Sequence, residues 1–218
     1  MIQSMKLVCF SNNTGGGLIC DLLNNTHNLT ENYNTNGRHH NAFKIGDTPS
    51  IELTINVDKW NNRIEKYNNQ NAWLGTHQHP SVIPNLKEFE KVLVITTTHR
   101  HSKLYRWLRY YYGWYKLAHP DWSENNTLES IDKIRELAKN VFIPFAPYEN
   151  CINIEFSKIV TGSFIKEYDL NLEYFKQWQD KNPWLYNVDR YCWAVNRFNE
   201  AEYEINNGVP FNYFNKYI

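Results

Sequence analysis

Residues 6–25 read KLVCFSNNTGGGLICDLLNN: a short apolar run, then a polar loop with three glycines, then an apolar segment with helical spacing. This order predicts a buried strand at 8–10, a loop, and a helix at about 18–23. The glycines at 15–17 would leave several backbone N–H groups exposed at the start of the helix, where the helix dipole adds partial positive charge. We therefore expect an anion such as a phosphate or sulfate to bind there.

Strand and helix patterns alternate along the rest of the chain, after a polar segment at 24–50 that we interpret as a loop. Residues 91–96 (KVLVIT) are almost continuously apolar, which is typical of a central parallel strand covered on both faces. Further strands are predicted at 51–57, 72–77 and 152–156, and further helices at 60–68, 102–117, 128–140, 171–181 and 187–207. The alternation predicts a single α/β domain over 1–218 with a mainly parallel sheet.

Composition limits the classes of partner. The 23 Lys and Arg residues balance 23 Asp and Glu residues, and a net charge of zero argues against binding to nucleic acid through bulk charge. The N-terminus lacks a basic region followed by an apolar one, and no apolar run approaches membrane-spanning length. The four cysteines form no Cys-x-x-Cys pair and fit buried free thiols in a reducing compartment. We therefore expect a cytoplasmic protein with no membrane partner.

The glycine-rich loop does not match two well-known nucleotide-binding motifs. It lacks the Gly-Lys-Ser/Thr ending of a Walker loop and the GxGxxG pattern of dinucleotide-binding folds, which disfavours a nucleoside triphosphatase or a dehydrogenase. Two interpretations stay open. Either the loop binds an anion, or its glycines only form a tight turn that packs the helix closely on the sheet.

The loop resembles the donor-binding loop of the cytosolic and phage-type sulfotransferases. In that family the first strand ends in Pro-Lys/Arg-Ser-Gly-Thr/Ser-Thr, and this loop grips the 5′-phosphosulfate of the donor. Residues 12–17 (NNTGGG) align with it so that Thr14 falls on the serine and Gly15 on the glycine. A later family strand often ends in Lys-Thr-His, and residues 75–77 (GTH) stand in that place.

Two more segments follow in the family's order. Residues 91–95 (KVLVI) and the helix from Ser102 are similar to its Lys-Val-Val-Tyr-Val strand and the Ser-, Tyr- and His-rich helix after it. Residues 154–160 (IEFSKIV) are similar to the strand and turn that bear its Tyr-Glu-Asp-Leu stretch. The resemblance spans most of the chain. It implies a three-layer α/β/α fold of the P-loop NTPase type, built around a mainly parallel sheet.

The resemblance also implies a reaction: sulfuryl transfer from 3′-phosphoadenosine 5′-phosphosulfate (PAPS) to a hydroxyl or amine on a small-molecule or glycan acceptor. His77 would be the base, with His79 as a competing candidate, although His77 could instead be an ordinary loop histidine. Asn13 would take the catalytic place where the family has a lysine or arginine, and it brings no charge. A metal is not expected, because the two histidines supply only two ligands.

The resemblance also implies which residues bind the donor. For the 5′-phosphosulfate they are Asn12, Asn13, Thr14, Gly15, Gly16 and Gly17. For the 3′-phosphate, the family's arginine falls on Thr97 and its serine on Tyr105. Arg100 is the nearest cation that could replace that arginine, with Ser102 beside it in the sequence. The family's C-terminal Arg-Lys-Gly loop is missing from this chain.

Two other functions are compatible with the sequence. A non-catalytic relative could bind a nucleotide or an anionic partner through the same loop. A nucleic-acid accessory protein could use the helix over 100–115, whose tyrosines and tryptophans are interleaved with Arg100, Lys103, Arg106 and Arg109. The alternative, which we favour, is that these aromatic side chains pack against the sheet while the cations face solvent or the donor phosphates.

Overall fold

The described part of the chain contains a sheet and the helices that follow its strands. The computed structural model describes residues 5–11, 14–24, 65, 73–112 and 143–207. The elements that form the sheet and its first connections are β1 (Lys6–Phe10), α1 (Gly16–Leu23), β2 (Trp73–Thr76), β3 (Lys91–Thr96), α3 (Arg100–Tyr110) and β4 (Cys151–Glu155). They are followed by α6 (Phe156–Val160), α7 (Ser163–Glu167), α8 (Leu172–Lys181) and α9 (Val188–Asn207).

The described strands form one parallel sheet in the order β2-β1-β3-β4. The register places Val8 beside Gly75 on one side and beside Leu93 on the other. The prediction of an α/β fold with a mainly parallel sheet is therefore confirmed. Because β2 and β3 lie on opposite sides of β1, the chain passes back across β1 between β2 and β3, and the described strand order changes direction at the boundary between β1 and β3. In open α/β sheets, ligands bind beyond the carboxyl ends of the strands at such a switch point.

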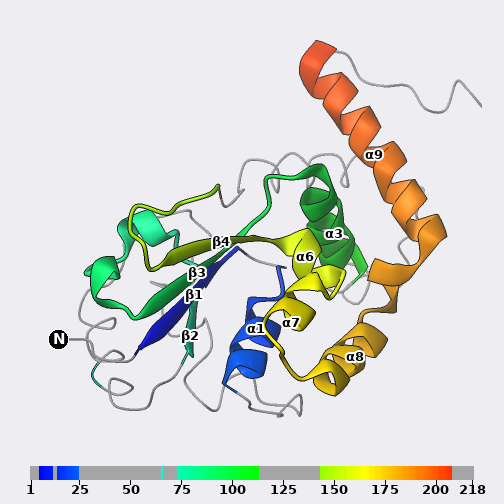
Figure 1. The fold of residues 1–218 in the computed structure, drawn as a ribbon. Helices are drawn as coiled ribbons and strands as arrows, with labels where there is room; N and C mark the ends of the chain where they lie inside the picture. The colour runs from blue at the N-terminus through cyan, green and yellow to red at the C-terminus, as the bar shows by residue number, and fades with distance from the viewer. Residues whose placement is uncertain (1–4, 12–13, 25–64, 66–72, 113–142, 208–218) are drawn as a thin grey trace, which may run out of the picture.

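Both faces of the sheet are buried, which explains the continuous apolar pattern of β3. On one face, Val8, Leu93 and Ile95 belong to a core that includes side chains from every α-helix named above. Figure 1 shows α1, α3, α6, α7 and α8 gathered to one side of the sheet. On the other face, Leu7 and Val94 belong to a second core. Within the described residues this second face is packed by strands, short 3-10 turns and Phe145, so the second helical layer of the three-layer fold stays a prediction.

For the strands and long helices, most first and last residues lie within about two residues of the positions predicted from the sequence. The strand predicted at 152–156 is β4, and the helices predicted at 171–181 and 187–207 are α8 and α9. The short helices α6 and α7 were not predicted. The loop at 24–50, the strand at 51–57 and the helices at 60–68 and 128–140 lie wholly or mainly outside the described residues.

Candidate anion-binding site

The β1–α1 turn brings the start of α1 to the carboxyl edge of the sheet. Thr14 is fully buried, and its hydroxyl donates to the carbonyl of Ser11 at 2.7 Å, which closes the turn. Gly15 follows with φ of 70°, in the left-handed region that favours glycine. Gly15 is also the N-cap of α1, so the cap residue offers no side-chain acceptor to the first N–H groups of the helix. Asn12 and Asn13, which the sequence nominated, lie outside the described residues.

Close packing explains why residue 16 is a glycine. A Cβ atom on Gly16 would lie 2.0 Å from the ring of Phe10, and a Cβ atom on Gly75 would lie 3.0 Å from the same ring. The ring of Phe10 also meets the ring of His77 edge-on, with centroids 4.5 Å apart. Gly17 is buried in the first turn of α1. Packing and anion binding are compatible here, because the same packing fixes the start of α1 against the ends of β1 and β2.

Two hydroxyl groups of this edge are buried and have no hydrogen-bond partner within the part of the chain that the structure describes. Ser11 directly follows β1 and Thr97 directly follows β3, and these two strands are neighbours. Ser11 is 5% exposed and Thr97 is 0% exposed, yet neither side-chain oxygen has a hydrogen-bond partner among the described residues. A buried polar group left unpaired costs about 1–3 kcal/mol, so such groups call for an explanation. The sequence nominated Thr97 but missed Ser11, although its place directly after a buried strand was a usable signal.

His77 lies at the same edge, one residue after β2. Its Nδ1 is 3.1 Å from the carbonyl oxygen of Phe10. A carbonyl can only accept, so we assign the proton to Nδ1, and the lone pair of the neutral ring then lies on Nε2. The half-buried ring therefore stands beside the β1–α1 turn in a tautomer that suits a base.

His79, the competing base, has a local structural role. It is the N-cap of the 3-10 turn Pro80–Val82, where its Nδ1 accepts from the backbone N–H of Ser81 at 3.2 Å. Its ring also meets the ring of Phe145 edge-on. Burial lowers the pKa of His79, although a hydrogen bond with the backbone of Ile143 opposes this shift. These contacts fix His79 to its own turn.

The start of α3 already holds a carboxylate of the protein. Glu155, the last residue of β4, accepts from the backbone N–H of Thr98 at 3.2 Å and of His99 at 3.5 Å. It also accepts from the hydroxyl of Thr98. Burial raises the pKa of Glu155, but hydrogen bonds from Ser102, Thr98 and Thr96 outweigh this effect, so its pKa lies below the ordinary value. Glu155 was not nominated from the sequence.

Two of the residues nominated for a 3′-phosphate, Arg100 and Ser102, have partners elsewhere. The guanidinium of Arg100 forms an ion pair with Glu202 at 3.1 Å and a hydrogen bond with Asn199, both on α9. Ser102 is fully buried, and its hydroxyl oxygen accepts from the backbone N–H of Ser157 in α6 at 3.0 Å. The structure thus keeps Thr97 at the carboxyl edge with the β1–α1 turn, but it directs Arg100 and Ser102 to other contacts.

The aromatic side chains of the 100–115 segment are mostly internal where they are described. Trp107, Tyr111 and Tyr112 are at most 4% exposed and belong to the core between the sheet and the helices. The ring of Trp107 stacks on that of Trp193 in α9, with centroids 4.9 Å apart. These three rings are therefore closed to stacking with nucleic-acid bases.

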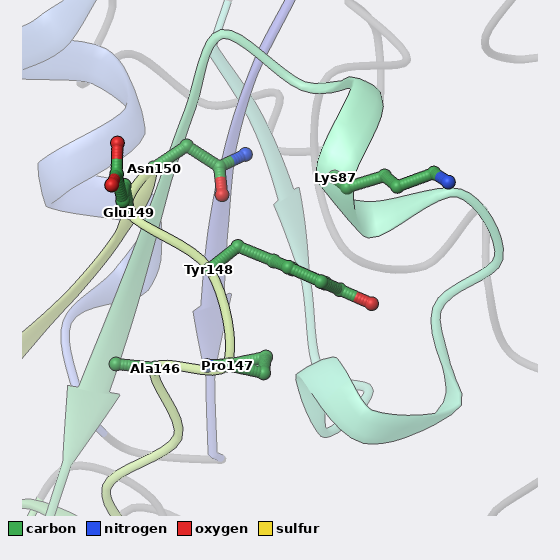
Figure 2. A pocket seen from close by; sticks show the side chains of 6 residues that line it. All are labelled: Lys87, Ala146, Pro147, Tyr148, Glu149 and Asn150. Atoms are coloured by element: carbon green, nitrogen blue, oxygen red, sulfur yellow. The ribbon is translucent and has the colours of Figure 1, made fainter.

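An open hollow of about 690 Å³ lies at the opposite edge of the sheet, before the amino ends of β3 and β4 (Figure 2). Its wall includes Lys87, Tyr148 and Glu149, and Figure 2 shows the ring of Tyr148 extending from one wall. Asn150 ties the walls together by donating to the carbonyls of Leu86 at 3.2 Å and Phe89 at 2.7 Å. The hollow is thus separated from His77 and the β1–α1 turn by the length of the strands.

Within the part of the chain that the structure describes, no three His, Cys, Asp or Glu side chains lie close enough together to hold a metal ion. The helices described there are all too short or too polar to cross a bilayer. Comparison of the sequence and the structure with protein-family models, curated proteins and solved structures finds no match.

Proposed function

We propose that the protein binds the 5′-phosphate or 5′-phosphosulfate end of a small molecule at the β1–α1 turn. The observation that carries the proposal is the pair of buried hydroxyls of Ser11 and Thr97 at adjacent strand ends, which have no hydrogen-bond partner among the residues that the structure describes. The oxygens of a bound anion would accept from both hydroxyls and remove the cost of leaving them unpaired. The start of α1 supplies backbone donors at the same edge, where the dipole of the helix favours negative charge.

Sulfuryl transfer is the reaction that we propose for this site, in a P-loop-type fold of three layers. The acceptor oxygen or nitrogen would form a bond to sulfur while the bond from sulfur to the bridging oxygen breaks. The acceptor's proton would pass to Nε2 of His77, and the departing 5′-phosphate would take the negative charge. The resemblance to sulfotransferases and the tautomer of His77 support this reaction. The start of α1 would stabilise the charge on the leaving group.

The contacts to the donor's 3′-phosphate depart from the resemblance. Arg100 is paired with Glu202, and the carboxylate of Glu155 brings negative charge to the start of α3. Both features disfavour a second phosphate there. The proposal therefore places the affinity in the 5′ end of the ligand, so adenosine 5′-phosphate (AMP) should bind at least as tightly as adenosine 3′,5′-bisphosphate.

Isothermal titration calorimetry with these two nucleotides tests the proposal. Saturable binding of AMP supports an anion site, and tighter binding of the bisphosphate would show that a 3′-phosphate contact exists after all. A Kd of about 1 mM corresponds to a binding free energy of about 4 kcal/mol. If neither nucleotide binds at about millimolar concentration, the proposal fails.

A non-catalytic protein that uses the same anion site is the second candidate. It is favoured by the neutral Asn13 at the place where the sulfotransferase loop carries a cation. Transfer of labelled sulfate from PAPS to a panel of hydroxyl and amine acceptors separates the two candidates. For an enzyme, His77→Gln should lower transfer by about 100-fold and leave the Kd for AMP unchanged. Nucleotide binding without transfer would favour the non-catalytic candidate.

A further inference from the structure

A guanidinium group reaches the β1–α1 turn from the last turn of α3. Nη1 of Arg109 lies 3.8 Å from the position that a Cβ atom on Gly15 would occupy. The guanidinium carbon lies 5.6 Å from the centre of the Trp178 ring in α8, within the range of a cation–π contact. The side chain is half-buried. Arg109 is far from the loop in the sequence, and only the fold brings the two together.

The guanidinium lies near aromatic rings that also approach Gly15. The same Cβ position on Gly15 is 3.5 Å from the ring of Phe156 in α6 and 3.8 Å from the ring of Trp178. The end of Arg109 and atoms of two aromatic rings therefore lie close to the same point beside Gly15. Apolar neighbours lower the local dielectric constant, and this strengthens the attraction between a guanidinium and an anion.

The β1–α1 turn has backbone donors but no cation within residues 11–17. Phosphate and sulfate groups are recognised most strongly when a charged donor adds to backbone N–H groups. A guanidinium keeps its charge at all ordinary pH values and presents several N–H donors in one plane. Arg109 is thus chemically suited to the part that the neutral Asn13 leaves unfilled.

We propose that Arg109 is the cation of the anion site and binds the 5′-phosphate or phosphosulfate held at the start of α1. This inference rests on the proposed function, which places an anion there. The second sign of a ligand is the hydroxyl of Ser11 in the same turn, which is 5% exposed and has no hydrogen-bond partner among the described residues. Arg109 would replace, from a different helix, the lysine or arginine that the sulfotransferase loop carries.

Matched arginine variants test the assignment, with AMP as the probe. Arg109→Gln should raise the Kd for AMP by about tenfold or more, because a charge-assisted contact to phosphate is lost. Arg190→Gln is the control: Arg190 also stacks on an aromatic ring, with its guanidinium 4.4 Å from the centre of Tyr112, but it lies on α9. The control should leave the Kd unchanged. Thermal unfolding without ligand checks that both variants fold.

A second measurement needs no variant to fold. In the wild-type protein, the side-chain ¹⁵Nε–H resonance of Arg109 should shift when AMP saturates the site, while that of Arg190 stays in place. If AMP binds but the Arg109 resonance does not move, or if Arg109→Gln binds AMP as the wild type does, the role of Arg109 is refuted and the anion site stands. If the wild-type protein does not bind AMP, both the inference and the proposed function fail.

Discussion

Two helices start at the same edge of the sheet, and the groups around their first N–H donors differ. Before α3, the N–H groups of Thr98 and His99 donate to the carboxylate of Glu155, so the protein supplies its own anion. Before α1, the cap is Gly15, which has no side chain, and the nearby hydroxyl of Ser11 has no hydrogen-bond partner in the described part of the chain. One helix start is thus filled permanently, and the other has the features of a site that an external anion completes.

The largest expected effect on stability comes from a substitution that displaces the start of α1 from the sheet. Gly16→Ala should lower the free energy of unfolding by about 3 kcal/mol, because its Cβ would lie 2.0 Å from the ring of Phe10 and the aromatic ring must shift. Gly15→Ala is the control: its nearest contact would be an ordinary 3.5 Å, and the cost is the left-handed backbone, about 1 kcal/mol. Urea unfolding measures both. A smaller loss for Gly16→Ala than for Gly15→Ala would contradict the packing described for α1.

The next largest effect is expected when the carboxylate of Glu155 is removed from the start of α3. Glu155→Gln should lower the free energy of unfolding by about 2 kcal/mol at pH 7, because charge-assisted hydrogen bonds to Thr98 and His99 are lost and solvent screens part of their strength. The pKa of Glu155 is below its ordinary value of 4.5, so this stabilisation is present at neutral pH and is lost as the pH falls below that value.

Acid unfolding of the wild type and the variant provides the measurement. The wild-type protein should lose stability more steeply than Glu155→Gln below about pH 4.5, since only the wild type takes up a proton at this position. Glu149→Gln, an exposed residue at the other edge of the sheet, should follow the wild type. Equal slopes for the wild type and Glu155→Gln would show that the carboxylate does not stabilise the start of α3.

The smallest expected effects compare the Ser11 hydroxyl, which we propose binds a ligand, with the Thr14 hydroxyl, which stabilises the turn. Ser11→Ala removes an unpaired buried hydroxyl, so the free energy of unfolding should rise by about 1 kcal/mol while the Kd for AMP increases about fivefold. Thr14→Val removes a hydroxyl bonded to the Ser11 carbonyl at 2.7 Å, so stability should fall by about 1 kcal/mol. Urea unfolding and calorimetry report both quantities. A loss of stability in Ser11→Ala would remove the argument for a ligand at this hydroxyl.

The helices and strands whose apolar residues follow a clear period could be predicted from the sequence, and the shortest helices could not. The apolar run of β3 and the helical spacing of α8 span enough residues to show their period. The helices α6 and α7 are five residues long, which is too short for a 3.6-residue period to emerge.

The site could be predicted as far as it depends on strand ends. The sequence placed Gly15, His77 and Thr97 after three different strands, and a parallel sheet brings the ends of those strands to one edge. The position of Glu155 depends on the register that sets it beside Thr96, which no local pattern fixes. Arg100 is close to Thr97 in the sequence, but its place on α3 turns it toward α9.

The central claim is that an anion binds at the start of α1 and not at the start of α3. An NMR titration of ¹⁵N-labelled protein with AMP tests it directly, because the backbone N–H resonances of both helix starts are observed together. The account predicts saturable shifts for Gly16, Gly17 and Leu18, and unchanged resonances for Thr98 and His99. Shifts confined to Thr98 and His99, or no shift at either helix start, would contradict it.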